Sequence, residues 1–232
     1  KKMIRKAIII SIGGPFLTGR EAHIIQKEKP WGIILFKRNI LSESQLINLT
    51  TKIKKITKDK KFPILLDEEG GRVSRISNFL DNSIYSQEYL GLIYKLNKKI
   101  GKKLYETYIN SLSKVFLKTG ININTSPVLD LKKKHTHKII GNRSYSTNSN
   151  IVNELGKLCI KFYKNNKIGT VIKHMPGHGS ADTDSHFKLP NVNNSLTSLK
   201  KTDFKCFKKI PSFFAMTAHI LYIQIDKKNN VT

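Results

Sequence analysis

The chain has 232 residues, of which 39% are hydrophobic and 25% are charged, a composition typical of one globular domain and not of a disordered or fibrous protein. The longest apolar run covers residues 7–12 and is far too short to span a membrane, and no signal-peptide pattern stands at the start. We therefore expect a cytoplasmic protein with no membrane partner, in which Cys159 and Cys206 are reduced core thiols.

The net charge of +26 is typical of nucleic-acid-binding proteins, whose cations gather on one face. In this chain the lysines are spread through every segment, so we expect no nucleic-acid partner. The arginines are distributed differently, because four of the six lie in motif-like segments, where a planar guanidinium can form paired hydrogen bonds with a ligand. These four are Arg38, Arg72, Arg75 and Arg143.

Short runs rich in Ile and Val alternate with longer segments of helical periodicity, which is typical of βα units and a parallel sheet. The expected strands cover residues 7–12, 31–36, 62–67, 121–125, 170–174 and 213–219. The expected helices cover residues 43–57, 95–119, a segment around 152–162 and a weaker one around 196–207. A closed barrel needs eight strands, so the sequence predicts an α/β fold of the (β/α)8 TIM type, incomplete, with residues 1–232 as a single domain that lacks its last strands.

The residues with functional chemistry follow these expected strands, at the end where a barrel of this type carries its site. Asp67 ends the third strand, and Asp130 comes shortly after the fourth. Lys173 and His174 end the fifth strand, and His219 ends the sixth. Because the carboxyl ends of parallel strands meet at one edge, we expect these side chains to lie on the same face of the barrel.

The densest group of such residues is the loop that follows the fifth strand. His174 and His178 have the spacing of helical zinc ligands, but the Pro-Gly pair at 176–177 prevents a helix there, so we expect no metal and no cofactor. Asp184 can orient His186 and stabilise the charge on an imidazole that donates and later accepts a proton. Acid–base chemistry is the favoured interpretation, and turn residues that only satisfy the loop backbone are the alternative.

The same loop resembles a known signature. Residues 173–179 and 184–186 resemble the Lys-His-Phe-Pro-Gly-His-Gly and Asp-Ser-His motifs of bacterial β-N-acetylhexosaminidases of glycoside hydrolase family 3, with Met175 in place of Phe. Further segments resemble the family in the same order, at residues 32–40, 67–75, 126–130, 140–145 and 216–219. The chain departs from the family pattern at Glu68, where Gln is usual, and at Asn142, where Asp is usual.

The resemblance implies a retaining hydrolase that removes terminal β-linked N-acetylglucosamine, with muropeptides from peptidoglycan recycling as the carbohydrate substrate. By matching position it implies His186 as general acid/base and Asp184 as the residue that orients it. Adjacent sugar hydroxyls suit charge-assisted hydrogen bonds. The resemblance assigns sugar binding to Asp67, Arg75, Arg143, Lys173 and His174. We expect a monomer.

Retention also requires a carboxylate that attacks the anomeric carbon. In the family this aspartate follows the seventh strand, so the resemblance places the nucleophile beyond Thr232, and Asp226 is the one acid after His219. Two alternatives to the hydrolase therefore stay open: a truncated, catalytically dead sugar-binding remnant, and a basic nucleic-acid-binding protein supported only by the net charge. For Asp67 and Arg143 themselves, the alternative to sugar binding is a structural ion pair at the barrel rim.

Overall fold

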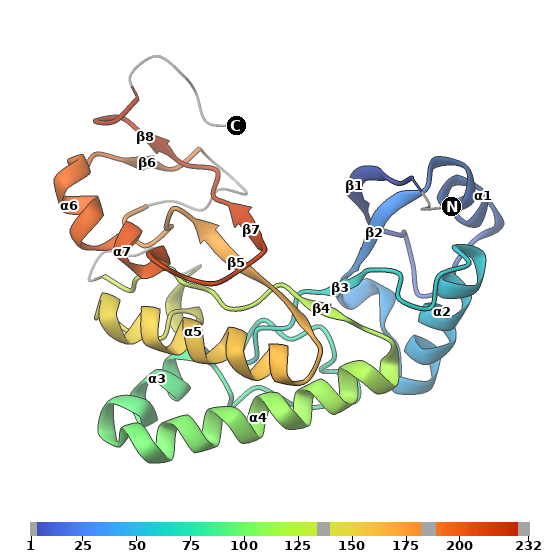
Figure 1. Cartoon of the computed structure of the whole chain (residues 1–232), viewed down its shortest axis with the longest axis horizontal. Helices are drawn as coiled ribbons and strands as arrows, with labels where there is room; N and C mark the ends of the chain where they lie inside the picture. The colour runs from blue at the N-terminus through green and yellow to red at the C-terminus, as the bar shows by residue number, and fades with distance from the viewer. Residues whose placement is uncertain (1–3, 134–139, 182–188, 227–232) are drawn as a thin grey trace.

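The main sheet has six parallel strands in the order β1-β2-β3-β4-β5-β7, and it curls around its own interior (Figure 1). The computed structural model describes residues 4–133, 140–181 and 189–226. The strands are β1 (Lys6–Ile10), β2 (Pro30–Leu35), β3 (Ile64–Leu66), β4 (Ile123–Asn124), β5 (Gly169–Met175) and β7 (Phe214–Thr217). All six predicted strands are confirmed, with bounds that differ by a few residues.

The curl brings strands from distant parts of the sheet into contact. Trp31 on β2 and Phe214 on β7 have ring centroids 5.3 Å apart, although three strands separate them in the sheet order. On their outer sides β1 and β7 have no partner strand among the described residues. Ile8 and Ile9 on β1 are accordingly 50% and 43% exposed. The fold is an α/β barrel of the (β/α)8 type that is incomplete, as the strand count predicts.

Helices cover the outer surface of the sheet, with α4 and α5 beneath β3–β5 in Figure 1 and α1 and α2 beside β1 and β2. They are α1 (Gly19–Glu28), α2 (Glu43–Ile56), α3 (Gln87–Leu96), α4 (Lys98–Thr119), α5 (Ser149–Asn165), α6 (Leu196–Lys201) and α7 (Asp203–Phe207). The start of α2 is as predicted, since the Ser42 side chain accepts a hydrogen bond from the backbone N–H of Gln45. The core lies between this helical layer and the sheet, and both cysteines are buried in it as free thiols.

Two helix predictions are wrong in detail. The helix expected at 95–119 begins at Lys98, because the Asn97 side chain accepts a hydrogen bond from the N–H of Ile100 and so caps a new helix there. The single helix expected around 196–207 is the pair α6 and α7, which is interrupted at Thr202. The helices α1 and α3 and the small sheet of β6 (Asn191–Val192) and β8 (Leu221–Tyr222) were not predicted.

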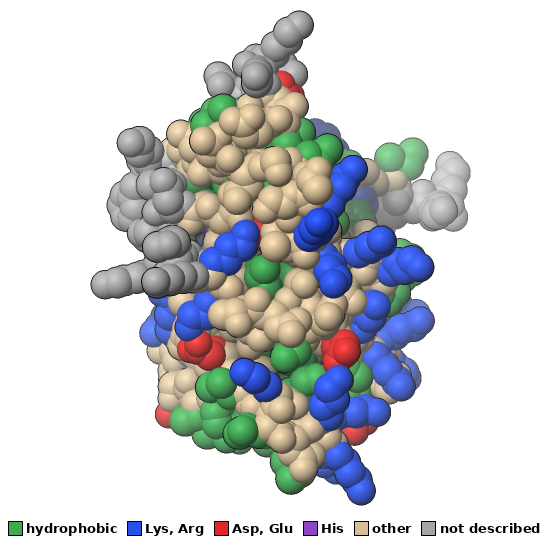
Figure 2. All heavy atoms as spheres, turned by 90° about the vertical axis from the view of Figure 1, so that its left-hand side faces the viewer, with side chains coloured by type: hydrophobic (Ala, Val, Ile, Leu, Met, Phe, Trp, Pro, Cys, Tyr) green, Lys and Arg blue, Asp and Glu red, His purple; other side chains and the backbone are tan. Residues whose placement is uncertain are grey.

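Basic side chains are spread over the surface. Figure 2 shows lysines and arginines over much of one face, with uncharged and hydrophobic surface between them. Within the described ranges no helix is both long and apolar enough to cross a membrane.

Candidate active site

A cavity of about 500 Å³ lies at the carboxyl ends of the strands. All five predicted sugar-binding residues line it: Asp67, Arg75, Arg143, Lys173 and His174. Asp67 directly follows β3, and Lys173 and His174 belong to β5, so the parallel sheet brings them to one edge. Arg143 ends a short 3₁₀ helix, η2 (Gly141–Arg143). The strand-end residues expected on one face, Asp67, Lys173, His174 and His219, all line this cavity, and Asp130 contacts His174, so that expectation is confirmed.

Asp67 is held by three donors. Its carboxylate accepts hydrogen bonds from Arg75 Nη2 at 2.5 Å and from Thr125 Oγ1 at 2.7 Å, and it forms an ion pair with Lys173. Burial on its own raises the pKa of Asp67, but the charges of Lys173 and Arg75 outweigh it and hold that pKa well below its usual value. Asp67 is therefore a carboxylate at neutral pH, with acceptor oxygens on the cavity wall.

Glu69 is a second buried acid of this network. Its carboxylate lies 2.5 Å from Lys173 Nζ, and it accepts hydrogen bonds from Arg143 Nε at 2.7 Å and Arg143 Nη2 at 2.8 Å. Burial raises the pKa of Glu69, but Lys173 and Arg143 outweigh it and lower that pKa overall. Sequence reasoning did not single out Glu69. Its presence in the family-like segment 67–75, between Asp67 and Arg75, is the signal that was missed.

Lys173 joins the two acids. Its side chain is only 2% exposed and contacts both Asp67 and Glu69. A buried ammonium is tolerated when it is paired, and here it is paired twice. The sequence left open an ion pair between Asp67 and Arg143 at the barrel rim. In the structure the described ion-pair partner of Arg143 is Glu69, and Asp67 is held by Arg75 and Lys173.

A second cluster surrounds Asp130, which is fully buried. Asp130 Oδ2 lies 2.6 Å from His174 Nδ1, and Oδ1 accepts the backbone N–H groups of His174 at 3.3 Å and His178 at 2.7 Å. Burial raises the pKa of Asp130, but His174 outweighs it and lowers that pKa. Burial lowers the pKa of His178, which keeps this imidazole neutral. Asp130 therefore fixes the ring of His174, and Nε2 is the ring nitrogen left for a ligand.

Among the described residues, the two histidines and the acids around them do not form a metal site. In the described part of the chain, no group of three or more His, Cys, Asp and Glu residues is placed to hold a metal ion. His174 uses Nδ1 for Asp130, and His178 Nδ1 has no hydrogen-bond partner within the described part of the chain.

A family model decides the assignment of this arrangement. Residues 16–231 match the N-terminal domain of glycosyl hydrolase family 3. The chain belongs to this family. The resemblance of the motifs around Asp67, Arg143 and Lys173 is thereby confirmed over almost the whole chain.

Individual relatives agree with this assignment. A β-hexosaminidase from Neisseria meningitidis is 32% identical over 97% of this chain and 62% of its own length. β-Hexosaminidase A from Pseudoalteromonas piscicida is 31% identical over 90% of this chain and 36% of its own length. Native NagZ from Neisseria gonorrhoeae superposes with a TM-score of 0.87 at 31% identity, over 97% of this chain and 66% of that one. The chain thus spans less than two thirds of these curated relatives.

Asp184 and His186, the predicted acid–base pair of this family member, lie outside the described residues. The described chain before them is well anchored. Ala181 is buried, and Ser180 Oγ donates to Asp203 Oδ2 at 2.8 Å. Asp203 is itself fully buried and also contacts Lys133. The roles of Asp184 and His186 stay predictions.

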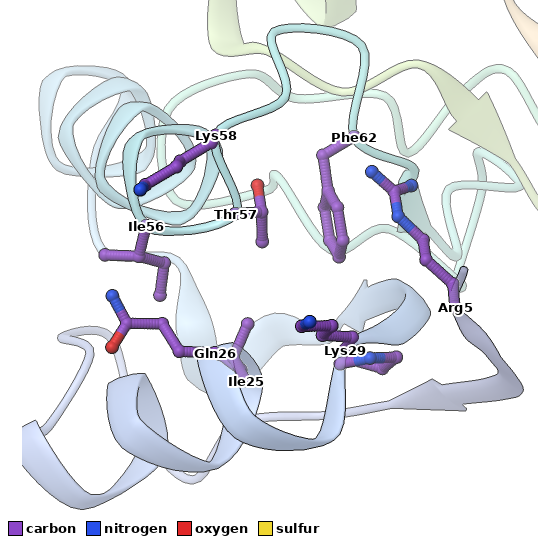
Figure 3. Close-up of a pocket in the computed structure, with 9 residues that line it drawn as sticks. Arg5, Ile25, Gln26, Lys29, Ile56, Thr57, Lys58 and Phe62 are labelled. Atoms are coloured by element: carbon purple, nitrogen blue, oxygen red, sulfur yellow. The ribbon is translucent and has the colours of Figure 1, made fainter. Parts of the chain in front are cut away.

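A second cavity, of about 330 Å³, lies at the amino ends of the strands (Figure 3). Phe62 and Thr57 point into it, and Arg5, Lys29 and Lys58 stand around it. No acid is among its described lining residues. It therefore offers no pair of groups for acid–base chemistry, in contrast to the carboxyl-end cavity.

Proposed function

We propose that the carboxyl-end cavity binds a terminal β-linked N-acetylglucosamine and that the protein is a retaining β-N-acetylglucosaminidase. The observation that carries this proposal is the convergence of Asp67, Arg75, Arg143, Lys173 and His174 on one cavity. A solved structure of Neisseria gonorrhoeae NagZ in complex with N-trifluoroacetyl-D-glucosamine, 31% identical to this chain with a TM-score of 0.86, supports an amino-sugar ligand.

The chemistry of the cavity suits such a ligand. A sugar hydroxyl both donates and accepts, so neighbouring hydroxyls match a wall on which a carboxylate alternates with cations. Asp67 supplies the acceptors, and Arg143 and Lys173 supply charged donors. These groups are already fixed by ion pairs, so little ordering accompanies binding.

In the proposed reaction His186, oriented by Asp184, protonates the glycosidic oxygen as the bond to the anomeric carbon breaks. A carboxylate, expected beyond Thr232, attacks that carbon and gives a glycosyl-enzyme. His186 then takes a proton from water, which displaces the carboxylate and releases the sugar with its β configuration.

We further propose muropeptides of peptidoglycan recycling as substrates, and a cytoplasmic monomer as the working form. The cavity supports an acidic substrate, because its described lining residues include four cations and one carboxylate, Asp67. The cations are Arg72, Arg75, Arg143 and Lys173. Muropeptides carry carboxylates near the scissile bond, which such a cavity attracts.

A second candidate function is sugar binding without turnover. The observation that favours it is that Asp67, the one carboxylate among the described lining residues, is engaged by Lys173 and Arg75 and is not free to attack a carbon. The two candidates share the binding site and differ in the supply of a nucleophile.

The test is calorimetric titration of the chain with N-acetylglucosamine, followed by an assay with an aryl β-N-acetylglucosaminide of a version extended through a seventh and an eighth strand. Saturable binding with turnover by the extended version supports the hydrolase, and saturable binding without turnover by that version supports the binding protein. No response to the sugar, together with salt-dependent binding to DNA, would replace both with a nucleic-acid-binding function.

A further inference from the structure

Glu69 has no role in the sugar-binding set that the resemblance implies, yet it contacts two members of that set. One oxygen, Oε1, lies 2.5 Å from Lys173 Nζ and 2.8 Å from Arg143 Nη2, and the other, Oε2, lies 2.7 Å from Arg143 Nε. Lys173 belongs to β5, and Arg143 belongs to η2. Glu69 therefore ties together two cations that come from separate segments.

The position of Glu69 separates it from the ligand. Lys173 and Arg143 line the carboxyl-end cavity, whereas Glu69 does not, and it is only 4% exposed. Its carboxylate lies behind the two cations. Paired hydrogen bonds from Nε and Nη2 fix the plane of the Arg143 guanidinium.

We propose that Glu69 is a positioning residue for sugar binding, which sets the places of the Lys173 ammonium and the Arg143 guanidinium without touching the sugar. The inference rests on the proposed function, because it deepens the same site. Long cationic side chains have many rotamers, and a donor that is displaced by about 1 Å loses most of a hydrogen bond. Removing Glu69 therefore weakens binding through both cations at once.

The neighbouring acid provides a matched control. Glu68 is 1% exposed, as deeply buried as Glu69, but it accepts hydrogen bonds from neutral donors, including the backbone N–H of Arg75 at 2.7 Å and Ser74 Oγ at 3.1 Å. The hydrogen bonds described for the Glu68 carboxylate involve neither Lys173 nor Arg143. Glu68→Gln changes a buried acid to an amide next to the site and leaves the two cations in place.

The experiment compares the full chain with Glu69→Gln, Glu69→Asp and Glu68→Gln by calorimetric titration with N-acetylglucosamine and by thermal unfolding. We expect Glu69→Gln to weaken binding by roughly 10- to 100-fold, the effect of losing charge-assisted hydrogen bonds. Glu69→Asp keeps the charge but shortens the side chain, so its affinity should lie between those of the full chain and Glu69→Gln. Glu68→Gln should stay within about twofold of the unchanged chain.

A ligand-free crystal structure of Glu69→Gln makes the inference testable apart from the proposed function. We expect the Lys173 ammonium or the Arg143 guanidinium to move, and unchanged positions of both overturn the inference whatever the sugar does. If the unchanged chain does not bind N-acetylglucosamine, the proposed function fails. The crystal structure still decides whether Glu69 positions the two cations.

The binding results decide in the same way. Equal affinities of Glu69→Gln and Glu68→Gln overturn the positioning role. If Glu69→Gln does not fold, Glu69→Asp decides by the same criterion. Unfolding of both variants assigns Glu69 to stability alone and also overturns the proposal.

Discussion

A cavity lined by cations lies at each end of the strands, and the two cavities differ in the acids that pair with those cations. At the carboxyl end, Lys173 and Arg143 are paired with Asp67 and Glu69, and both acids are largely buried. At the amino end, Arg5 pairs with Asp59, and these side chains are 16% and 29% exposed. Cations near a cavity are thus common in this chain, and buried acids that hold them in place distinguish one end from the other.

The amino-end cations also have an ordinary structural explanation. Lys29 caps the carboxyl end of α1, and Lys58 follows the carboxyl end of α2, where helix carbonyls favour positive charge. The Arg5 guanidinium stacks over the Phe62 ring, with 4.9 Å between the guanidinium carbon and the ring centroid. These contacts stabilise the end of the barrel that, in folds of this type, serves stability.

The largest expected effect concerns catalytic turnover at the carboxyl-end cavity of residues 1–232. A polypeptide of residues 1–232 should release no detectable nitrophenol from an aryl β-N-acetylglucosaminide. Without an attacking carboxylate no glycosyl-enzyme forms. Asp67, Glu69 and Asp130 are engaged by cations or histidine, and Glu68 is buried among neutral donors. The assay is nitrophenol release at neutral pH. Turnover that disappears in Asp130→Asn or Asp226→Asn would contradict a nucleophile outside this polypeptide.

The next largest effect is on stability. Lys173→Met should lower the free energy of unfolding by roughly 3–5 kcal/mol, because it leaves two buried carboxylates facing each other without their shared cation. Arg5→Ala at the amino end should cost no more than about 1 kcal/mol, as expected for a partly exposed pair. Urea unfolding of both variants measures the difference. Similar losses at the two ends would remove the distinction between them.

Ligand binding sharpens the same contrast. Asp67→Ala and Arg143→Ala should each weaken N-acetylglucosamine binding by roughly 1–3 kcal/mol, the loss of one charge-assisted hydrogen bond. Lys58→Ala, at the amino-end cavity, should leave the affinity unchanged. Calorimetric titration measures all three variants. A larger loss of affinity in Lys58→Ala than in Arg143→Ala would show that the sugar binds at the amino-end cavity, contrary to our proposal.

The sequence predicts the part of the site that follows from strand order. Asp67 and Lys173 stand at the ends of apolar runs, and parallel pairing brings such positions together without further information. The partner of Arg143 could not be read in this way. Glu69 lies 74 residues away from it, and their contact depends on how two irregular segments fold.

The same difference between periodic and irregular segments explains the errors in the predicted fold. The sheet strands are apolar runs of recognisable period, and they were found. The β6–β8 pair has two residues in each strand, too few to show any period. The break at Asn97 was missed because the apolar periodicity continues from α3 into α4, and a single capping side chain makes the boundary.

The smallest expected effect separates the two neighbouring acids at the carboxyl end. Burial raises the pKa of Glu68 above its usual value, whereas the cations lower that of Glu69. An acid whose folded pKa is raised stabilises the fold fully below its unfolded pKa, and this contribution is lost as pH rises through the folded pKa. Ionised Glu68 therefore reduces stability at neutral pH.

Glu68→Gln removes that ionisation and keeps an acceptor oxygen for the backbone N–H of Arg75. It should therefore raise the free energy of unfolding at pH 7. The increase should be no more than about 1.5 kcal/mol, the size of one hydrogen bond. The Asn82 side chain, which donates to Glu68 at 3.2 Å, can turn its amide and accept from the new amide nitrogen. The gain should shrink as pH falls toward the unfolded pKa of Glu, near 4.3, because Glu68 is then protonated in both states. Asp67, Glu69 and Asp130 titrate alike in both proteins, so the difference between two urea-unfolding series over this range isolates Glu68. A gain that grows on acidification would mean that Glu68 stabilises the fold as a carboxylate, like Glu69, and that burial among neutral donors does not distinguish the two.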